Sequence, residues 1–211
     1  MAVHGPRSAL GPADVGDERF SRMVAESLGV DRVEVRDGEV SVAEYDIEAL
    51  TTAGRFWVRG TARYEGGTSP YAFFVKVVQS WTRSPAFAHV PPHMRKAAAA
   101  GLPWRTEPRI YRSDLAARLP PGFSMPTAYA VVDLDDESAA LWLAGIDVDP
   151  APWRLASFEQ AARGLGRLAA STAVAPLRAL AVPTSSAATS TAASSTRWCP
   201  RCAIPGCGST R

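Results

Sequence analysis

The chain has 211 residues, of which 46% are hydrophobic and 21% are charged, a composition typical of a folded protein rather than a disordered one. Its formal net charge of +2 gives no strong field to attract nucleic acid or an anionic membrane. No apolar run approaches the roughly 20 residues that span a bilayer, and the N-terminus lacks the apolar stretch of a secretory signal. We therefore expect a cytoplasmic protein of one large domain or one and a half, without nucleic-acid or membrane partners.

Residues 1–29 form an N-terminal segment in which a short helix is expected, with Asp14 as a candidate cap and a glycine at its end. Over residues 33–42, valines alternate with polar residues on either side of the pair Asp37-Gly38. This pattern is typical of a hairpin whose turn is the Asp-Gly pair. The same alternation extends its second strand through Tyr45 and Ile47.

Arginines alternate with apolar residues along the next strand, between residues 55 and 63. The arginines are Arg55, Arg59 and Arg63. Three arginines on one face could indicate nucleic-acid binding. No adjacent segment extends the basic patch, so we expect a solvated sheet face instead.

The central feature is the stretch YAFFVKVVQ at residues 71–79, which follows a turn-like segment at 65–70 and reads as a strand. Alternation places Lys76 on one face with apolar neighbours. A buried ammonium group requires an anionic partner. Alternatively, the strand lies at a sheet edge and the lysine reaches water from it. The strand sequence leaves both readings open.

Residues 80–105 resemble a long insertion, with prolines followed by an alanine run that favours a helix near residues 94–100. A helix is then predicted over Thr106–Leu119, with Thr106 as its cap and a Pro-Pro-Gly sequence as its end. Glu107 precedes Tyr111 by four residues and so lies on the buried stripe. This carboxylate either stabilises the helix dipole from the first turn or meets a cation.

Strands at residues 127–133 and 138–146 are predicted to form a second hairpin, joined by Asp135-Asp136-Glu137. The second of these strands is apolar on both faces, so we expect it to be buried. A linker at 147–152 and an amphipathic helix over 155–168 follow. From about residue 173 the chain is rich in Ser, Thr and Ala, and we expect it to be disordered. Its cysteines could form a redox pair or a zinc site, but the neighbouring sequence supplies neither the flanking elements nor a fourth ligand. They are Cys199, Cys202 and Cys207.

This order of elements has a chemical use. A sheet with one packed helix can bring the strand lysine and the helix acid together, so that the ammonium lies over the phosphates of a nucleotide. A loop of small residues lets backbone amides approach the same phosphates. The chain resembles the N-terminal lobe of the aminoglycoside phosphotransferase family of kinase-like small-molecule phosphotransferases over roughly residues 30–172. The matching segments are FFVKVVQS (73–80), EPRIYRSDLAARLPPGFSMPTAYAVVD (107–133), ALWLAGI (140–146) and SFEQAARGLGRLAA (157–170).

The resemblance implies an α+β fold: a five- to six-stranded antiparallel sheet with a packed helix, one helix of the second lobe and a disordered tail. The expected segments are an N-terminal segment with a short helix (1–29), the kinase-like N-terminal lobe (30–146), a hinge linker with the first helix of the second lobe (147–172) and the disordered tail (173–211). Lys76 would contact the phosphates of ATP or GTP, and Glu107 would orient it. The phosphate loop would be Thr51, Thr52, Ala53 and Gly54, although it lacks the several glycines of a protein-kinase loop. The hinge positions would be Leu143, Ala144 and Ile146, with Ala144-Gly145 where the family often has an acidic pair.

The resemblance stops before the catalytic lobe, which carries an HxD loop, an asparagine and an aspartate that hold Mg²⁺. The chain has no asparagine, no aspartate after Asp149 and no histidine after His93. We therefore expect it to be inactive in phosphoryl transfer, and a small-molecule acceptor would bind only with a second lobe present. A frame change or an early stop in the gene would produce such a sequence. A non-catalytic binding module and a nonfunctional fragment are the alternatives.

Overall fold

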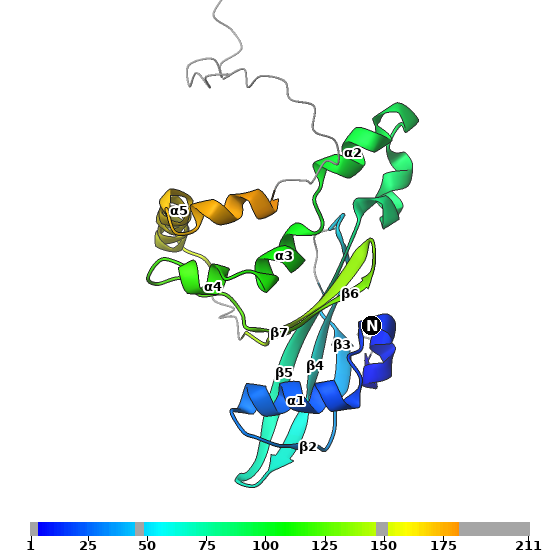
Figure 1. Cartoon of the computed structure of the whole chain (residues 1–211), viewed down its shortest axis with the longest axis vertical. Coiled ribbons are helices and arrows are strands. Elements are labelled where there is room, and N and C mark those ends of the chain that lie inside the picture. Colours follow the sequence, from blue (N-terminus) through cyan, green and yellow to red (C-terminus); the bar gives the residue numbers. More distant parts are fainter. Residues whose placement is uncertain (1–3, 45–48, 147–151, 182–211) are drawn as a thin grey trace, which may run out of the picture.

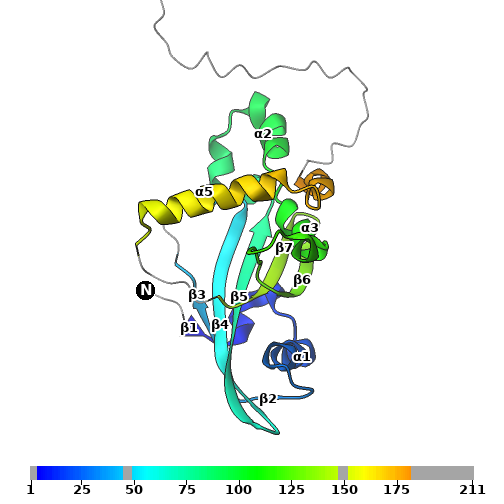
Figure 2. The same ribbon diagram turned by 90° about the vertical axis from the view of Figure 1, so that its left-hand side faces the viewer.

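The computed structural model describes residues 4–44, 49–146 and 152–181. It is an α+β fold in which an antiparallel sheet curls into a half-barrel and helices lie against both of its faces (Figures 1 and 2). The strands are β1 (His4–Gly5), β2 (Glu34–Val35), β3 (Glu39–Val42), β4 (Thr52–Tyr64), β5 (Gly67–Gln79), β6 (Ala128–Asp135) and β7 (Ser138–Ala144). Their order is β1-β3-β4-β5-β7-β6, with β2 also beside β4. The sheet therefore has seven strands, more than expected, because two of them are only two residues long.

The helices are α1 (Asp17–Leu28), α2 (Arg95–Gly101), α3 (Thr106–Arg112), α4 (Leu115–Arg118) and α5 (Leu155–Ala170). Within the described residues, five 3-10 segments accompany them, among them η1 (Arg7–Ala13) before α1 and η5 (Ala175–Ala181) after α5. Among the residues that the structure describes, no helix is both long and apolar enough to cross a membrane.

Helix α1 covers one face of the sheet. Its cap is Gly16 rather than Asp14, whose carboxylate instead accepts hydrogen bonds from Arg7 and from the Val15 amide. The expected glycine end is confirmed, because Gly29 adopts the left-handed conformation at φ 67°. Phe20 is buried and makes edge-to-face ring contacts with the core aromatics. These partners are Tyr71, Phe73 and Trp142, at centroid distances of 5.6, 5.9 and 5.8 Å.

The prediction of a hairpin over residues 33–42 is wrong. Strands β2 and β3 do not pair with each other but follow one another along the same edge of β4, opposite Arg63 and Arg59. Asp37 explains the difference, because its carboxylate accepts hydrogen bonds from both the amide and the hydroxyl of Thr61. The Asp-Gly pair therefore holds an irregular edge segment against β4 instead of reversing the chain.

Strands β4 and β5 form a hairpin, and its turn is shorter than the turn-like segment predicted at residues 65–70. Only Glu65 and Gly66 lie outside the strands, so that residues 67–70 belong to β5. Pro70 is tolerated there because β7 pairs with β5 only from Phe73 onward, which leaves that part of β5 with one neighbour. The predicted alternation is confirmed: Tyr71, Phe73 and Val75 are buried on the α1 face.

The second hairpin is confirmed, with β6 and β7 joined at Asp136-Glu137. Strand β7 lies between β5 and β6 and is buried along most of its length. Leu141 and Trp142 are both 0% exposed and point to opposite faces. The continuous apolar sequence of β7 is therefore explained by two covered faces, α1 on one side and α3 on the other.

The helix predicted over Thr106–Leu119 is interrupted. Helix α3 ends at Arg112 and α4 begins at Leu115. The Ser113 hydroxyl donates to the Ile110 carbonyl at 2.7 Å and accepts from the Leu115 amide at 3.2 Å, so this side chain replaces helical backbone bonds. Thr106 does not cap α3 either. It is the first helical residue, and its buried hydroxyl has no hydrogen-bond partner among the described residues.

The insertion after β5 extends beyond the end of the sheet (Figure 1). It consists of η2 (Trp81–Arg83), η3 (Pro85–His89), η4 (Pro92–Met94) and α2. His89 and His93 lie in separate 3-10 segments, as the two prolines between them predict. Within the ranges that the structure describes, no group of three or more His, Cys, Asp or Glu side chains is placed to hold a metal ion.

Helix α5 is attached by a narrow inner face, where Gly164 contacts the ring of Phe123. Its predicted apolar stripe is mostly exposed: Leu155 is 75%, Phe158 57% and Leu165 66% accessible. Segment η5 follows beside α3, so ordered structure continues past residue 173, where the disordered tail was expected to begin. Residues 182–211, with the three cysteines, lie outside the described residues, as do 45–48 and 147–151.

Candidate functional site

Lys76 lies on β5, which is an interior strand with β4 on one side and β7 on the other. The edge-strand reading of this lysine is therefore wrong. Its face of the sheet also carries Phe74 and the buried Val78, which belong to the apolar cluster under α3. The side chain of Lys76 is 22% exposed. An ammonium group in this position is stable only with a countercharge nearby.

Glu107 supplies that charge. The ammonium nitrogen of Lys76 donates to the Glu107 Oε2 at 2.5 Å, and the glutamate side chain is 33% exposed. The two residues are 31 positions apart in the sequence, so the pair forms only when α3 lies across β5. Of the two readings for Glu107, contact with a cation is therefore confirmed. This contact is the predicted association of strand lysine and helix acid.

Apolar packing fixes the position of Glu107. Trp104, just before α3, and Tyr111 within it pack against a cluster that contains Leu141 and Leu143 of β7. Burial raises the pKa of the Tyr111 hydroxyl, and the negative charge of Glu107 contributes to the increase. Tyr111 and Glu107 therefore share one side of α3, as their spacing of four residues predicts.

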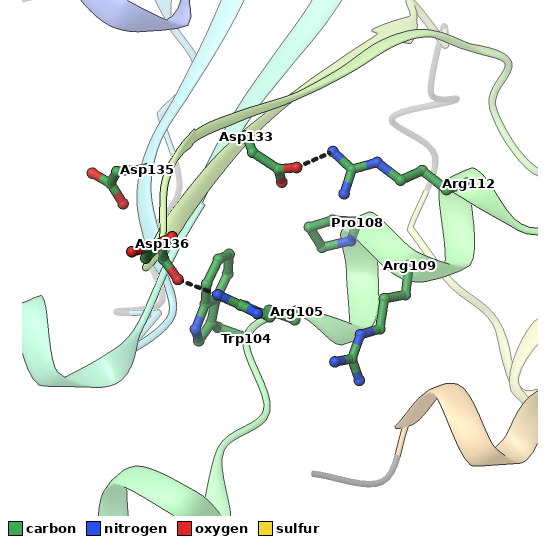
Figure 3. Close-up of a pocket in the computed structure, with 8 residues that line it drawn as sticks. All are labelled: Trp104, Arg105, Pro108, Arg109, Arg112, Asp133, Asp135 and Asp136. Atoms are coloured by element: carbon green, nitrogen blue, oxygen red, sulfur yellow. Dashed lines mark hydrogen bonds and ion pairs between the residues drawn. The ribbon is translucent and has the colours of Figure 1, made fainter. Parts of the chain in front are cut away.

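The other side of α3 faces β6 across a small hollow of about 290 Å³. Figure 3 shows one ion pair and one hydrogen bond across it. Arg112 pairs with Asp133 at 3.0 Å, and Arg105 donates to the Asp136 carbonyl. The side chains in this hollow include arginines and aspartates in equal number, three of each. We infer that the polar contacts across this hollow fix the orientation of α3 on the sheet.

The start of the insertion is held to the same hairpin. Arg83 pairs with Asp135 at 2.7 Å and with Glu137 at 3.2 Å. The hydrogen bond from Arg83 and, to a smaller extent, the one from the Glu137 amide lower the pKa of the Asp135 carboxyl to about 2. Both ends of the segment between β5 and α3 are thus attached to the β6–β7 turn, which restricts where α3 can lie.

The predicted phosphate loop lies next to Lys76 in the sheet register. Thr52 is paired with Val78 and Gly54 with Val77, and the irregularity between them leaves Ala53 as an extra residue. The Thr51 carbonyl accepts from the Gln79 amide at 2.9 Å. Most of this segment is therefore strand with a bulge rather than an open loop. At Gly54, a Cβ atom would lie 2.7 Å from the ring of Phe56, so any other residue there would require the Phe56 ring to move.

The predicted hinge positions are at the end of β7. Leu143 is buried, whereas Ile146 is 51% exposed. The Ala144 amide donates to the Thr127 carbonyl at 2.8 Å, and the Gly145 amide to the Ala72 carbonyl at 3.2 Å. Two backbone amides of the hinge segment therefore already donate hydrogen bonds to neighbouring strand residues. A base edge would have to bind other backbone groups of this segment.

Sequence reasoning missed an aromatic pair beside Lys76. Trp57 of β4 and Phe74 of β5 are register partners, with ring centroids 5.1 Å apart, and Arg59 lies over the Trp57 ring at 4.1 Å. Both aromatic side chains are half-buried. The alternation in β4 and β5 assigned each residue to a face but could not show that the two strands align in this register.

The fold and site define an α+β protein with a curled antiparallel sheet that carries a half-buried Lys–Glu ion pair and an adjacent aromatic pair. Comparison with known proteins found no matching family model, no matching curated protein and no matching solved structure. The particular function must therefore be argued from these side chains.

Proposed function

We propose that this chain is the nucleotide-binding lobe of a kinase-like small-molecule phosphotransferase, similar to the aminoglycoside phosphotransferase family. The observation that carries the proposal is the 2.5 Å contact between Lys76 and Glu107. In kinase-type sites, a strand lysine contacts the nucleotide phosphates and a helix glutamate holds that lysine in place. Strand order, helix position and the ion pair are consistent with this arrangement.

The ligand we propose is ATP or GTP. Its phosphates would lie at the Lys76 ammonium, close to the bulge at Ala53 and Gly54. Its base would lie toward the end of β7, where Trp57 and Phe74 offer aromatic surface. Stacking of a base on an aromatic side chain contributes about 1–3 kcal/mol and is tolerant of base identity. The described side chains therefore give no reason to prefer ATP over GTP.

Phosphoryl transfer itself is not part of the proposal for these 211 residues. The family's reaction uses Mg²⁺, which hard oxygen ligands hold. Glu107 is occupied by Lys76, and the described residues contain no acidic cluster that fits the ion. The HxD aspartate and the metal-binding asparagine have no counterpart in the sequence. We therefore assign nucleotide binding, and an acceptor hydroxyl would be phosphorylated only by a protein that also has the catalytic groups.

One observation favours a second candidate, a non-catalytic module that binds a partner protein. The exposed stripe of α5 presents Leu155, Phe158 and Leu165 to solvent, and contiguous apolar surface of this kind marks interaction sites or promotes aggregation. Such a module would keep the fold without binding nucleotides. A stable fold without nucleotide affinity would favour this candidate, and insolubility on expression would favour a nonfunctional fragment.

The proposal is tested by titrating the full chain with ATP in a calorimeter. We expect saturable binding to the wild type and a loss of at least tenfold in affinity for Lys76→Ala, because a charge-assisted contact to phosphate contributes roughly 1.5–3 kcal/mol. Lys96→Ala on α2 is the matched control and should bind like the wild type. Equal affinity of the two variants would contradict the proposal, as would a folded wild type that binds no ATP.

A further inference from the structure

The insertion between β5 and α3 contains basic residues and no acidic ones. No aspartate or glutamate occurs anywhere between Glu65 and Glu107. The insertion extends beyond the end of the sheet (Figures 1 and 2), and we call its outer part, residues 89–101, the basic tip. The tip carries four basic side chains, all of them exposed: His89, His93, Arg95 and Lys96.

The base of the insertion is attached to the rest of the fold, so the tip is held on a defined support. Arg83 pairs with two acids of the β6–β7 hairpin at one end, and Arg105 donates to the Asp136 carbonyl at the other. Between these attachments, the rings of Trp81 and Phe87 pack edge to face with their centroids 5.3 Å apart. A partner of the tip therefore meets a surface that needs little further ordering, which reduces the entropic cost of binding.

The cations of the basic tip have no carboxylate partner among the residues that the structure describes. The Arg95 Nε donates to the Val90 carbonyl at 3.0 Å, which holds the guanidinium in place through a neutral group. Its terminal nitrogens are left to face solvent, and a guanidinium held in this way can bind a carboxylate with two parallel hydrogen bonds. Lys96 adds a second full positive charge next to it in the chain.

The side chains around these charges favour a protein's carboxylates over other anions. A helix that lies on a membrane inserts several large apolar side chains, but Met94 is the one large apolar side chain of the described tip that is exposed. Single-stranded nucleic acid binds where its bases can stack on aromatic rings, but Trp81 and Phe87 are packed against each other below the tip. An acidic protein segment requires only the positive charges that the tip presents.

We infer that the basic tip is a docking surface for an acidic segment of a partner protein, whose carboxylates bind Arg95 and Lys96. The inference is independent of the proposed function, because the tip shares no residue with the site around Lys76 and Glu107. Contacts between exposed charges are individually weak and are screened by salt. The surface therefore suits a reversible partner whose affinity decreases as the ionic strength rises.

The test measures the binding of a fluorescein-labelled hexaglutamate peptide to the full chain by fluorescence anisotropy at low salt. We expect saturable binding that weakens as salt is added. The double variant Arg95→Gln/Lys96→Gln should lower the affinity roughly fivefold or more. The matched control, Arg22→Gln/Arg163→Gln, removes the same charge from exposed helix positions that have glutamate partners, and it should stay within about twofold of the wild type. Circular dichroism confirms that each variant is folded.

Three results would overturn the inference. Equal losses in the two double variants would mean that net charge alone attracts the peptide. A folded wild type that does not bind the peptide at low salt would rule out the docking surface. Tighter binding of a single-stranded oligonucleotide or of phosphatidylserine vesicles, lost in the Arg95→Gln/Lys96→Gln variant, would assign the tip to a different class of partner. Titration with ATP separates the two proposals, because the variant of the tip should bind ATP as the wild type does.

Discussion

The hydroxyl of Tyr71 lies where three chain segments meet. It donates to the Asp37 carbonyl at 2.6 Å, and burial raises its pKa to about 12. The space for this contact comes from two glycines. A Cβ atom would lie 2.8 Å from the Tyr71 oxygen at Gly38 and 2.5 Å from it at Gly60. The irregular edge between β2 and β3 therefore depends on residues without side chains, which the alternating valine pattern does not reveal.

Gly60→Ala is therefore expected to destabilise the fold. The added methyl group would collide with the Tyr71 hydroxyl and the Asp37 carbonyl, and overpacking of this kind costs about 1–3 kcal/mol in the free energy of unfolding. Gly166→Ala on α5 is the control, because nothing lies within 4 Å of its Cβ position and helical Ala is favoured over Gly by about 1 kcal/mol. Urea unfolding measures both. A Gly60→Ala variant as stable as Gly166→Ala would refute this account of the edge.

The individual charged residues of the site could be predicted, but their neighbours could not. Lys76 and Glu107 were identified because a buried charge in an apolar stretch requires a partner, and the structure places them in contact. Arg55 was assigned to the arginine face of β4, but Trp57 on the same face was not identified. The importance of Trp57 depends on which β5 residue it opposes, and a strand sequence does not specify its pairing register with another strand.

At the scale of elements, the orientation of α3 decides whether the ion pair forms. This seven-residue helix is too short to be stable alone, so contacts at its ends and beneath it hold it in place. Trp104 and Tyr111 pack below it, and Arg112 pairs with Asp133 beside it. The break at Ser113 was not predicted, because Leu115 and Leu119 continue the helical spacing although the Ser113 hydroxyl ends the helix.

The contact of the insertion with the β6–β7 turn predicts a pH dependence. The pKa of Asp135 is lowered from 3.8 to about 2, mainly by Arg83. A carboxyl group with a lowered native pKa stabilises the fold above its unfolded pKa, and this contribution is lost as the pH falls through the native value. For Asp135, the loss therefore falls between about pH 4 and pH 2.

Arg83→Gln should return the pKa of Asp135 toward 3.8, because the main cause of its decrease is removed. It should also reduce the loss of stability in that acidic range. Carboxyl carbon NMR titration measures the pKa. In Arg118→Gln, the control, the pKa of Asp114 should rise while Asp135 stays unchanged. An Asp135 that titrates normally in the wild type would refute the proposed contact.

At the scale of the whole molecule, the sheet separates two environments. Helix α1 covers a closed aromatic core on one face, whereas the α3 face is only partly covered and carries Lys76, Arg55 and the Trp57–Phe74 pair. Hydrophobic periodicity predicted most of the strands and helices in their order along the chain, and the α+β class was expected from the family resemblance. Strand β1 and segment η5 were not predicted, because segments this short carry too little pattern to be recognised. The exposed stripe of α5 was predicted as a helix face, but its exposure depends on tertiary contacts.

The most direct test of the central claim is to map ADP binding on the uniformly ¹⁵N-labelled full chain by amide NMR shifts. We predict that shifts concentrate at Lys76, Arg55, residues 51–54 and the end of β7, with little change in α1. Shifts confined to the hollow between Arg112 and Asp133, or none at saturating ADP, would contradict the claim that the Lys76–Glu107 pair marks a nucleotide site.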